Sequence, residues 1–167
     1  IILISGYLAR AVRDGQESEA REMMTYAEFL AGMAFNSASL GYVHAMAHQL
    51  GGFYDLPHGV CNAILLPHVQ AYNAKAVPER FVEIAAAMGI DTRDMSPTEC
   101  ADAALQAIRD LSAEVNIPPD LAAFDMVKPD DFSILADNAM KDACGATNPK
   151  QPTKDEVISL FQAAYQG

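Results

Sequence analysis

Apolar residues recur every three or four positions along most of this 167-residue chain, and that spacing constrains the fold more than any other feature. It is the period of an amphipathic α-helix. No segment alternates apolar and polar residues for long enough to predict a strand. We therefore predict an all-α, bundle-like domain. The expected helices cover residues 1–13, 18–36, 38–50, 57–73, 78–88 and 129–143, with two more that open after Ser96 and after Thr153.

Two of these helix starts carry a capping box. The segments 96–99 (SPTE) and 153–156 (TKDE) each place a hydroxyl residue three positions before a glutamate. In a capping box each of these two side chains accepts a hydrogen bond from the backbone of the other residue. Pro97 adds a second start signal, because proline suits the first helical position. Both segments therefore predict helix N-termini.

Two of the expected helices are apolar enough to be buried. Residues 18–36 are rich in methionine and alanine, and residues 38–50 are nearly as apolar. Such a stripe is typical of a core. In the second helix Gly41 permits close contact with a neighbouring helix, and we expect Gly51-Gly52 to end it.

The charge balance limits the classes of partner. Acidic residues outnumber basic ones by 22 to 11, for a net charge of −11. Such a chain repels phosphate, so nucleic acid and anionic membranes are poor partners and we expect neither. No apolar run reaches the roughly 18 residues of a membrane helix. The widely spaced Cys61, Cys100 and Cys144 are typical of free thiols in a reducing compartment, so we expect a cytoplasmic protein.

Three of the four histidines lie within fifteen residues of one another. His44 and His48 are four residues apart, so a helix presents both on one face. His58 lies between Pro57 and Gly59, where a chain reversal can return it to that face. Burying imidazoles costs several kcal/mol unless they find partners, and a metal cation supplies one. The cluster therefore predicts a metal site.

Two features narrow this prediction. His68 follows His58 by ten residues, a rotation of about 280° around a helix, so His68 is expected to be a structural residue. The residues between His44 and His48 are Ala-Met-Ala, without the glutamate that a zinc peptidase uses as its general base. A peptidase mechanism is excluded.

The histidines belong to a longer pattern that resembles the signature of the iron-dependent (group III) alcohol dehydrogenases. The resemblance spans essentially the whole chain. That family has an N-terminal α/β domain that binds NAD(H) or NADP(H), and an all-helical C-terminal domain that holds the metal. The matching segments are Gly41-x2-His44-x3-His48-x2-Gly51-x5-Pro57-His58-Gly59, Leu66-Pro67-His68-Val69 with Asn73, residues 30–36 (LAGMAFN), and Asn148-Pro149-Lys150.

The resemblance implies a role for each residue of the histidine cluster. His44 and His58 match metal ligands of the family. His48 matches a histidine that lies beside the nicotinamide and the substrate and assists proton movement, so it is both the catalytic and the cofactor-contacting candidate. By resemblance alone, Phe35, Leu40 and Cys144 are candidates for the substrate pocket, although each is as well explained as ordinary helix core.

The resemblance also implies that part of the protein lies outside this chain. The family's other two ligands, an aspartate and a histidine four residues later, have no counterpart here, and neither has its glycine-rich nucleotide loop. The chain also begins within a helical pattern, without a capping residue. We therefore expect residues 1–167 to be the metal and substrate domain of a longer protein that lacks its nucleotide-binding domain here. Ile1, Ile2, Ile4 and Leu8, or the helix face that carries the histidines, should then be unusually exposed.

The implied activity is the oxidation of an alcohol, or the reduction of an aldehyde, with NAD(H) or NADP(H). The implied metal is Fe2+, with Zn2+ or another divalent ion as a substitute. The metal acts as a Lewis acid on the substrate oxygen. We expect a homo-oligomer, and we expect this chain alone to be inactive.

Two other interpretations remain open on the residues alone. One is a self-sufficient metal-binding domain in which His44, His48 and His58 are all ligands. The other is a structural module with buried histidines and no metal. The convergence of the ring nitrogens discriminates between them: His44 with His58 favours the dehydrogenase, all three favour the self-sufficient site, and none favours the structural module.

Overall fold

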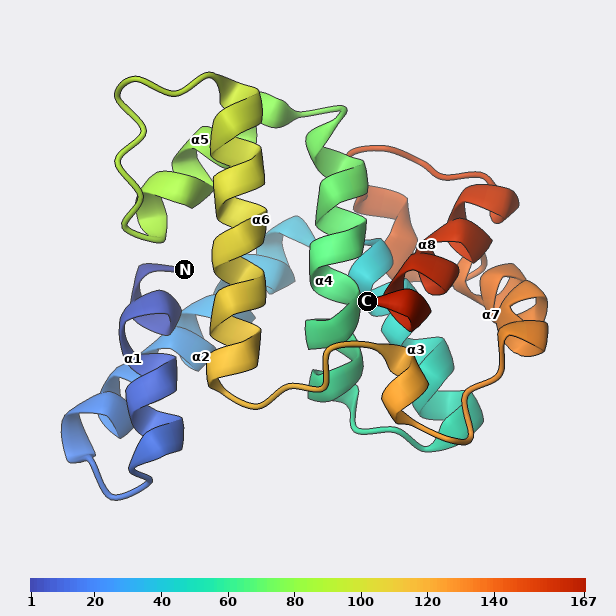
Figure 1. Cartoon of the computed structure of the whole chain (residues 1–167), viewed down its shortest axis with the longest axis horizontal. Helices are drawn as coiled ribbons and strands as arrows, with labels where there is room; N and C mark the ends of the chain where they lie inside the picture. Colours follow the sequence, from blue (N-terminus) through green and yellow to red (C-terminus); the bar gives the residue numbers. More distant parts are fainter. The chain divides into compact units, whose positions relative to one another are not determined.

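The computed structural model describes residues 1–167 and contains helices and no strands, which confirms the all-α prediction (Figure 1). No helix is both long and apolar enough to span a bilayer. The α-helices are α1 (Ile2–Arg13), α2 (Ser18–Ala38), α3 (Tyr42–Tyr54), α4 (His58–Ala74), α5 (Pro78–Ala87), α6 (Pro97–Glu114), α7 (Phe132–Ala139) and α8 (Lys154–Gln166), and the 3-10 helices are η1 (Leu121–Ala123), η2 (Pro129–Asp131) and η3 (Ala143–Thr147).

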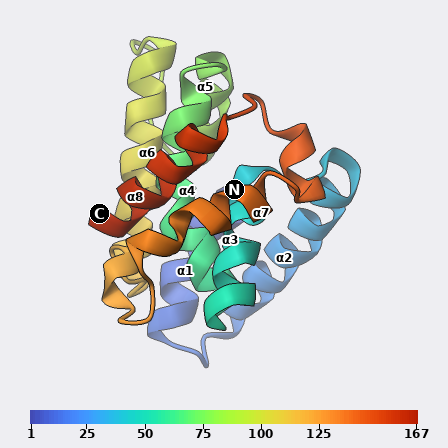
Figure 2. The ribbon, with the colours of Figure 1, turned by 90° about the vertical axis from the view of Figure 1, so that its right-hand side faces the viewer.

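The chain divides into two compact units. The first contains residues 1–39 and 77–116, and the second contains residues 40–76 and 117–167. In the second unit α3 packs against α4 and α7, and α8 packs against the same two helices, so the four form a closed ring (Figure 2). The short η3 packs against α3, and η1 packs against α8.

The second unit encloses the continuous apolar cluster of the protein. Met46 and Leu50 of α3, Leu65 of α4, and Phe132 and Phe161 are fully buried in it. The rings of Phe132 and Phe161 stack with their centroids 5.5 Å apart. Each such side chain contributes about 1.5–3 kcal/mol by leaving water. The expectation of a buried helix in this region is therefore confirmed, but the helix covers Tyr42–Tyr54 rather than residues 38–50, and Ala38 is the last residue of α2.

In the first unit α1 packs against α2 and α6, and α6 packs against α5. The expectation that residues 18–36 form a buried helix is wrong. Of the 21 residues of α2 only Ala20 and Ala27 are buried, whereas Phe29 is 66% exposed and Leu30 and Met33 are more than half exposed. The two buried residues of α2 are both alanines, so the face of α2 that packs against its neighbours is formed by small side chains. The apolar composition of a helix does not specify how many of its faces pack against other helices. Ile1 and Ile2 are exposed, as expected, but Ile4 and Leu8 are half-buried because α1 packs against α2 and α6.

Both predicted capping boxes are present. The hydroxyls of Ser96 and Thr153 accept hydrogen bonds from the backbone of Glu99 and Glu156, whose carboxylates bind back to the capping residues. The predicted end of α3 is wrong by four residues. Gly51 and Gly52 lie within the helix, and the chain leaves it at Asp55, which adopts a left-handed conformation with φ 57°. Aspartate is one of the few residues that tolerate this conformation.

The predicted helix over residues 129–143 is also divided. It is a 3-10 turn, then α7, then a break before η3. At the break the Asp142 carboxylate accepts a hydrogen bond from the backbone N–H of Cys144, 2.9 Å away. An aspartate that bonds to its own backbone in this way competes with helical hydrogen bonding. The break matters because it frees Asp142 to reach α3.

Candidate active site

Three imidazole rings meet where α3 faces the start of α4. His44 and His48 lie one turn apart on α3, and His58 is the first residue of α4. The left-handed Asp55 and the fixed φ of Pro57 turn the chain between them. The ring centroids of His44 and His58 are 5.3 Å apart, those of His48 and His58 also 5.3 Å, and those of His44 and His48 6.0 Å.

The ring orientations indicate which two histidines can bind one ligand together. The rings of His48 and His58 are stacked at 20°, whereas the rings of His44 and His58 are tilted by 55°. An imidazole lone pair lies in the ring plane, so two stacked rings cannot direct their lone pairs to one point between them. The geometry therefore favours a shared ligand for His44 and His58 over one for all three histidines.

The environment keeps the His44 imidazole neutral. Burial is the largest cause that lowers its pKa below 6.5, and the neighbouring His58 and His48 lower the pKa further. Nearby Asp142 acts in the opposite sense but does not outweigh them. A lower pKa means that the ring holds no extra proton at neutral pH. A lone pair is then free for a metal, which binds only the neutral ring.

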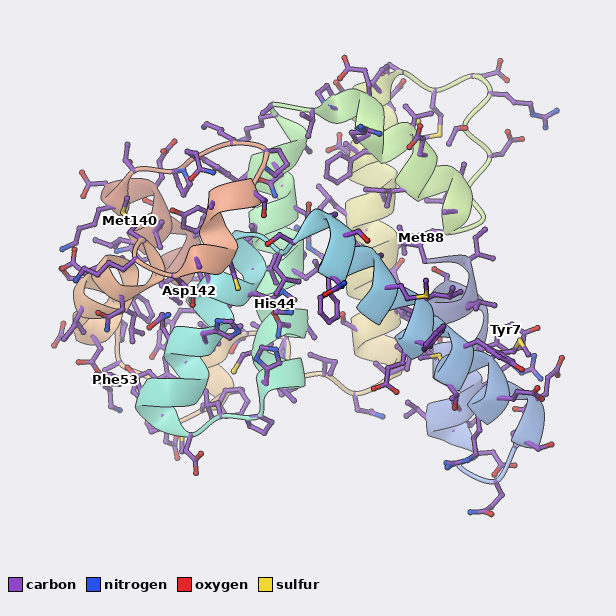
Figure 3. All side chains as sticks on the ribbon, turned by 180° about the vertical axis from the view of Figure 1, so that it is seen from behind. Tyr7, His44, Phe53, Met88, Met140 and Asp142 are labelled. Atoms are coloured by element: carbon purple, nitrogen blue, oxygen red, sulfur yellow. The ribbon has the colours of Figure 1, made fainter.

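His48 pairs with a carboxylate that the sequence did not single out. Its Nδ1 lies 2.8 Å from Oδ2 of Asp142, and Figure 3 shows Asp142 near His44. Burial by itself raises the pKa of Asp142, but the hydrogen bonds from His48 and from Cys144 outweigh it, so the pKa lies below its ordinary value. The ionised carboxylate can only accept, and therefore His48 Nδ1 carries the proton.

Asp142 was missed because no local pattern marks it. It lies 94 residues from His48, in a stretch that was expected to be helical. An exposed helical aspartate is an ordinary feature of an acidic chain. The only available signal was its position two residues before Cys144, which the resemblance had already selected.

A buried amide pair holds the segment around Asp142 against α3. Asn148 and Asn73 exchange hydrogen bonds through their side-chain amides, at 2.7 and 3.2 Å. The same Asn148 Oδ1 accepts from the backbone N–H of Tyr42 at the start of α3. Gly41 makes this approach possible, since a Cβ there would lie 2.8 Å from that oxygen. The close contact expected of Gly41 is therefore present, with a loop residue as its neighbour.

His58 has a polar neighbour of its own on α4. The side-chain Nδ2 of Asn62 lies 3.0 Å from Nε2 of His58 and also donates to the His58 carbonyl. Asn62 Oδ1 is buried without a hydrogen-bond partner. Asn62 therefore helps to fix the orientation of the His58 ring. No sequence pattern marks Asn62.

The three candidate pocket residues lie in different places. Cys144 is half-buried, and its sulfur lies within 4.8 Å of ligand atoms of both His48 and Asp142. Burial and the neighbouring Asp142 raise the pKa of its thiol. Leu40 is half-buried just before α3, and its carbonyl accepts a hydrogen bond from Thr147. Phe35 is on α2, in the first unit, and is half exposed.

Comparison with known proteins gives a consistent result. The family model described as the Fe-containing alcohol dehydrogenase family, C-terminal, matches residues 1–165. Alcohol dehydrogenase 4 of Schizosaccharomyces pombe is 55% identical over 98% of this chain and 38% of its own length. The 1,3-propanediol dehydrogenase of Citrobacter freundii is 50% identical over 99% of this chain and 42% of its own length.

Solved structures agree with these sequence matches. A 1,3-propanediol oxidoreductase is 48% identical and superposes with a TM-score of 0.96, over 98% of this chain and 43% of that one. An alcohol dehydrogenase from Oenococcus oeni is 49% identical with a TM-score of 0.95, over 98% of this chain and 43% of that one. The chain spans about two fifths of the length of these relatives. With its helical fold, its histidine cluster and a match over nearly every residue, this chain belongs to the Fe-containing alcohol dehydrogenase family and corresponds to the C-terminal part of its members.

Proposed function

We propose that residues 1–167 form the metal and substrate domain of an NAD(P)-linked alcohol dehydrogenase. The observation that carries the proposal is the contact between the rings of His44 and His58, made by two helices that the family match covers from end to end. Relatives of this chain include a 1,3-propanediol dehydrogenase, an NAD-dependent methanol dehydrogenase and a lactaldehyde reductase. These names support a small alcohol, diol or aldehyde as the substrate.

The residues present suit a divalent transition metal. His44 and His58 offer two imidazole nitrogens, a donor type that suits Fe2+ and Zn2+ alike. The lowered pKa of His44 keeps its donor available at neutral pH. We propose Fe2+ as the metal, held by these two residues together with ligands from the rest of the enzyme. When bound, the metal supplies Lewis acidity toward an alcohol or carbonyl oxygen.

His48 would act as the proton carrier. Its Nδ1–H donates to Asp142, so the free lone pair of the ring is on Nε2. Asp142 fixes this tautomer and stabilises the ring when a proton arrives at Nε2. The His48 side chain is 38% exposed, so that proton can pass to water. In the full enzyme His48 would also contact the nicotinamide of NAD(H) or NADP(H).

The remaining proposals rest on resemblance. Cys144, next to His48 and Asp142, is the best placed of the three pocket candidates, and Leu40 and Phe35 remain candidates on the resemblance alone. We also propose a cytoplasmic homo-oligomer. The self-sufficient three-histidine site has less support, because His48 stacks on His58 and directs Nδ1 to Asp142.

A chimera tests the proposal. Residues 1–167 would replace the matching 42% of the Citrobacter freundii 1,3-propanediol dehydrogenase, which is 50% identical over that region. We expect Fe2+ binding and NAD-linked oxidation of 1,3-propanediol. His44→Ala and His58→Ala should each reduce the bound iron to background. His48→Gln should keep the iron but lower kcat by about 10²–10⁴-fold, the usual contribution of a positioned acid or base.

His68→Gln is the matched control, because it removes an imidazole from α4 outside the cluster and should leave both readouts near those of the parent chimera. Circular dichroism would confirm that each variant is folded. Loss of iron in His48→Gln as complete as in His44→Ala would contradict the role given to His48. Full iron retention in both His44→Ala and His58→Ala would contradict the proposed metal site.

A further inference from the structure

A second set of metal-binding atoms lies on the other side of His48. His48, Asp142 and Cys144 present one ligand atom each, and these three atoms all lie within 4.8 Å of one another. The set combines an imidazole nitrogen, a carboxylate oxygen and a sulfur. It shares no residue with the His44–His58 pair.

The chain holds these three donors in place by contacts that do not involve a metal. Asp142 already binds His48 through one oxygen and the backbone of Cys144 through the other. Directly after Cys144, Gly145 packs on the ring of Tyr42, where a Cβ would come within 3.1 Å of the ring. The hydrogen bond from the Cys144 backbone to Asp142 and the packing of Gly145 can remain when an ion binds, so little conformational entropy is lost, whereas the His48–Asp142 hydrogen bond is exchanged for bonds to the ion.

We propose that His48, Asp142 and Cys144 form a second, sulfur-containing site that binds Zn2+. Nitrogen, oxygen and sulfur are the donors of zinc sites, and three protein ligands with one water is a common arrangement. With bond lengths of about 2.0–2.3 Å, two ligands of a tetrahedral ion lie about 3.3–3.8 Å apart. A pair of ligand atoms at the 4.8 Å limit therefore needs to close by about 1–1.5 Å, whereas Nδ1 of His48 and Oδ2 of Asp142, which are 2.8 Å apart, need to open by about 0.5 Å. The side chains of His48 and Asp142 are 38% and 17% exposed, which leaves a route for the ion.

Binding changes the protonation of two residues. The Cys144 thiol releases its proton to solvent as the Zn–S bond forms. The proton on Nδ1 of His48 moves to Nε2 through solvent, and the Nδ1 lone pair binds the ion, which replaces the hydrogen bond to Asp142. His48 then has no free lone pair to accept a proton. Zn2+ here should therefore inhibit turnover, a consequence that rests on the proposed function.

Cobalt distinguishes this site from the His44–His58 pair. The full 167-residue chain, freed of metal, would be titrated with Co2+, whose thiolate complexes absorb through charge transfer in the near ultraviolet. We expect this absorption in the wild type and its loss when Zn2+ displaces Co2+. Cys144→Ser should abolish it, and Asp142→Asn should weaken Co2+ binding at least about tenfold. Cys100→Ala, a buried cysteine of the first unit, and His44→Ala should retain the absorption.

Alkylation gives a second measurement that needs no variant. Cys144 is the half-buried cysteine, and Zn2+ should protect it from a thiol reagent. No charge-transfer absorption in the wild type, its persistence in Cys144→Ser, or alkylation unaffected by Zn2+ would each overturn the site. Iron binding that fails in the chimera while this absorption forms would instead count against the proposed function. If turnover of the chimera is unchanged at Zn2+ concentrations that occupy the site, the predicted inhibition by Zn2+ is wrong, but the site itself is not overturned.

Discussion

The two units of this chain use similar apolar composition in different ways. In the second unit, α3 buries six of its thirteen residues, and its cluster continues through α4, α7 and α8. In the first unit, α1 buries no residue fully and α2 buries two alanines. Large apolar side chains such as Phe29 and Met33 are exposed there instead.

The candidate site lies in the unit that has the continuous core. His44 and His48 lie on α3, which buries six residues in that core, and Asp142 directly precedes η3, which packs against α3. A site that must hold donor atoms to within fractions of an ångström needs such support. The difference teaches that an apolar run predicts a helix, but burial depends on how many faces of the helix are covered.

The largest expected effect compares an aromatic residue in each unit. Phe161→Ala removes a fully buried ring that stacks on Phe132, and should lower the free energy of unfolding by about 3–5 kcal/mol. Phe29→Ala truncates a ring that is 66% exposed, and should change the free energy of unfolding by about 0.5 kcal/mol or less. Urea denaturation measures both. Equal losses would mean that the exposed face of α2 is covered in solution.

Glycine-to-alanine substitutions should change the stability of the protein in opposite directions in the two units. Gly41→Ala forces its Cβ against Asn148 Oδ1, disrupts the buried amide pair and should cost about 1–3 kcal/mol. Gly6→Ala meets no atom within 4 Å in the middle of α1, and should stabilise the protein by about 0.5–1 kcal/mol. Thermal unfolding would show the two shifts. A neutral Gly41→Ala would mean that the approach of Asn148 is not required.

The two capping boxes test whether the units are independently stable. Ser96→Ala should weaken α6 in the first unit, and Thr153→Ala should weaken α8 in the second, each by about 1 kcal/mol. Hydrogen exchange resolves where protection is lost. We expect each loss to remain within its own unit. Loss across both units from either substitution would show that they unfold together.

The smallest expected effect is a pH dependence at the start of α8. Hydrogen bonds from the Thr153 backbone and from Lys150 lower the pKa of Glu156 from 4.5 to about 2. Between these values the unfolded chain binds more protons than the folded one, so the stabilisation is complete above pH 4.5 and is lost as the pH falls to 2. Glu156→Gln should flatten this part of the stability curve. An unchanged slope would assign the pH dependence to other carboxylates.

The candidate site was partly accessible from the sequence. The i, i+4 spacing of His44 and His48 requires only a helix, and Pro57 with Gly59 marks the turn that returns His58. Asp142 and Asn62 could not be found in the same way. Asp142 reaches His48 from 94 residues away, through a break in an expected helix, and Asn62 is one polar residue on an apolar helix.

What the sequence determined by itself was local. Periodicity, capping boxes and the histidine spacing depend on residues within four or five positions of each other, so the helices and the facing imidazoles of α3 could be predicted. Only the tertiary structure decided which apolar faces are buried, that Asn148 fastens the loop to α3, and that Asp142 and Cys144 meet His48. These contacts join segments about a hundred residues apart, and their energy depends on the packing of the whole unit rather than on any local pattern.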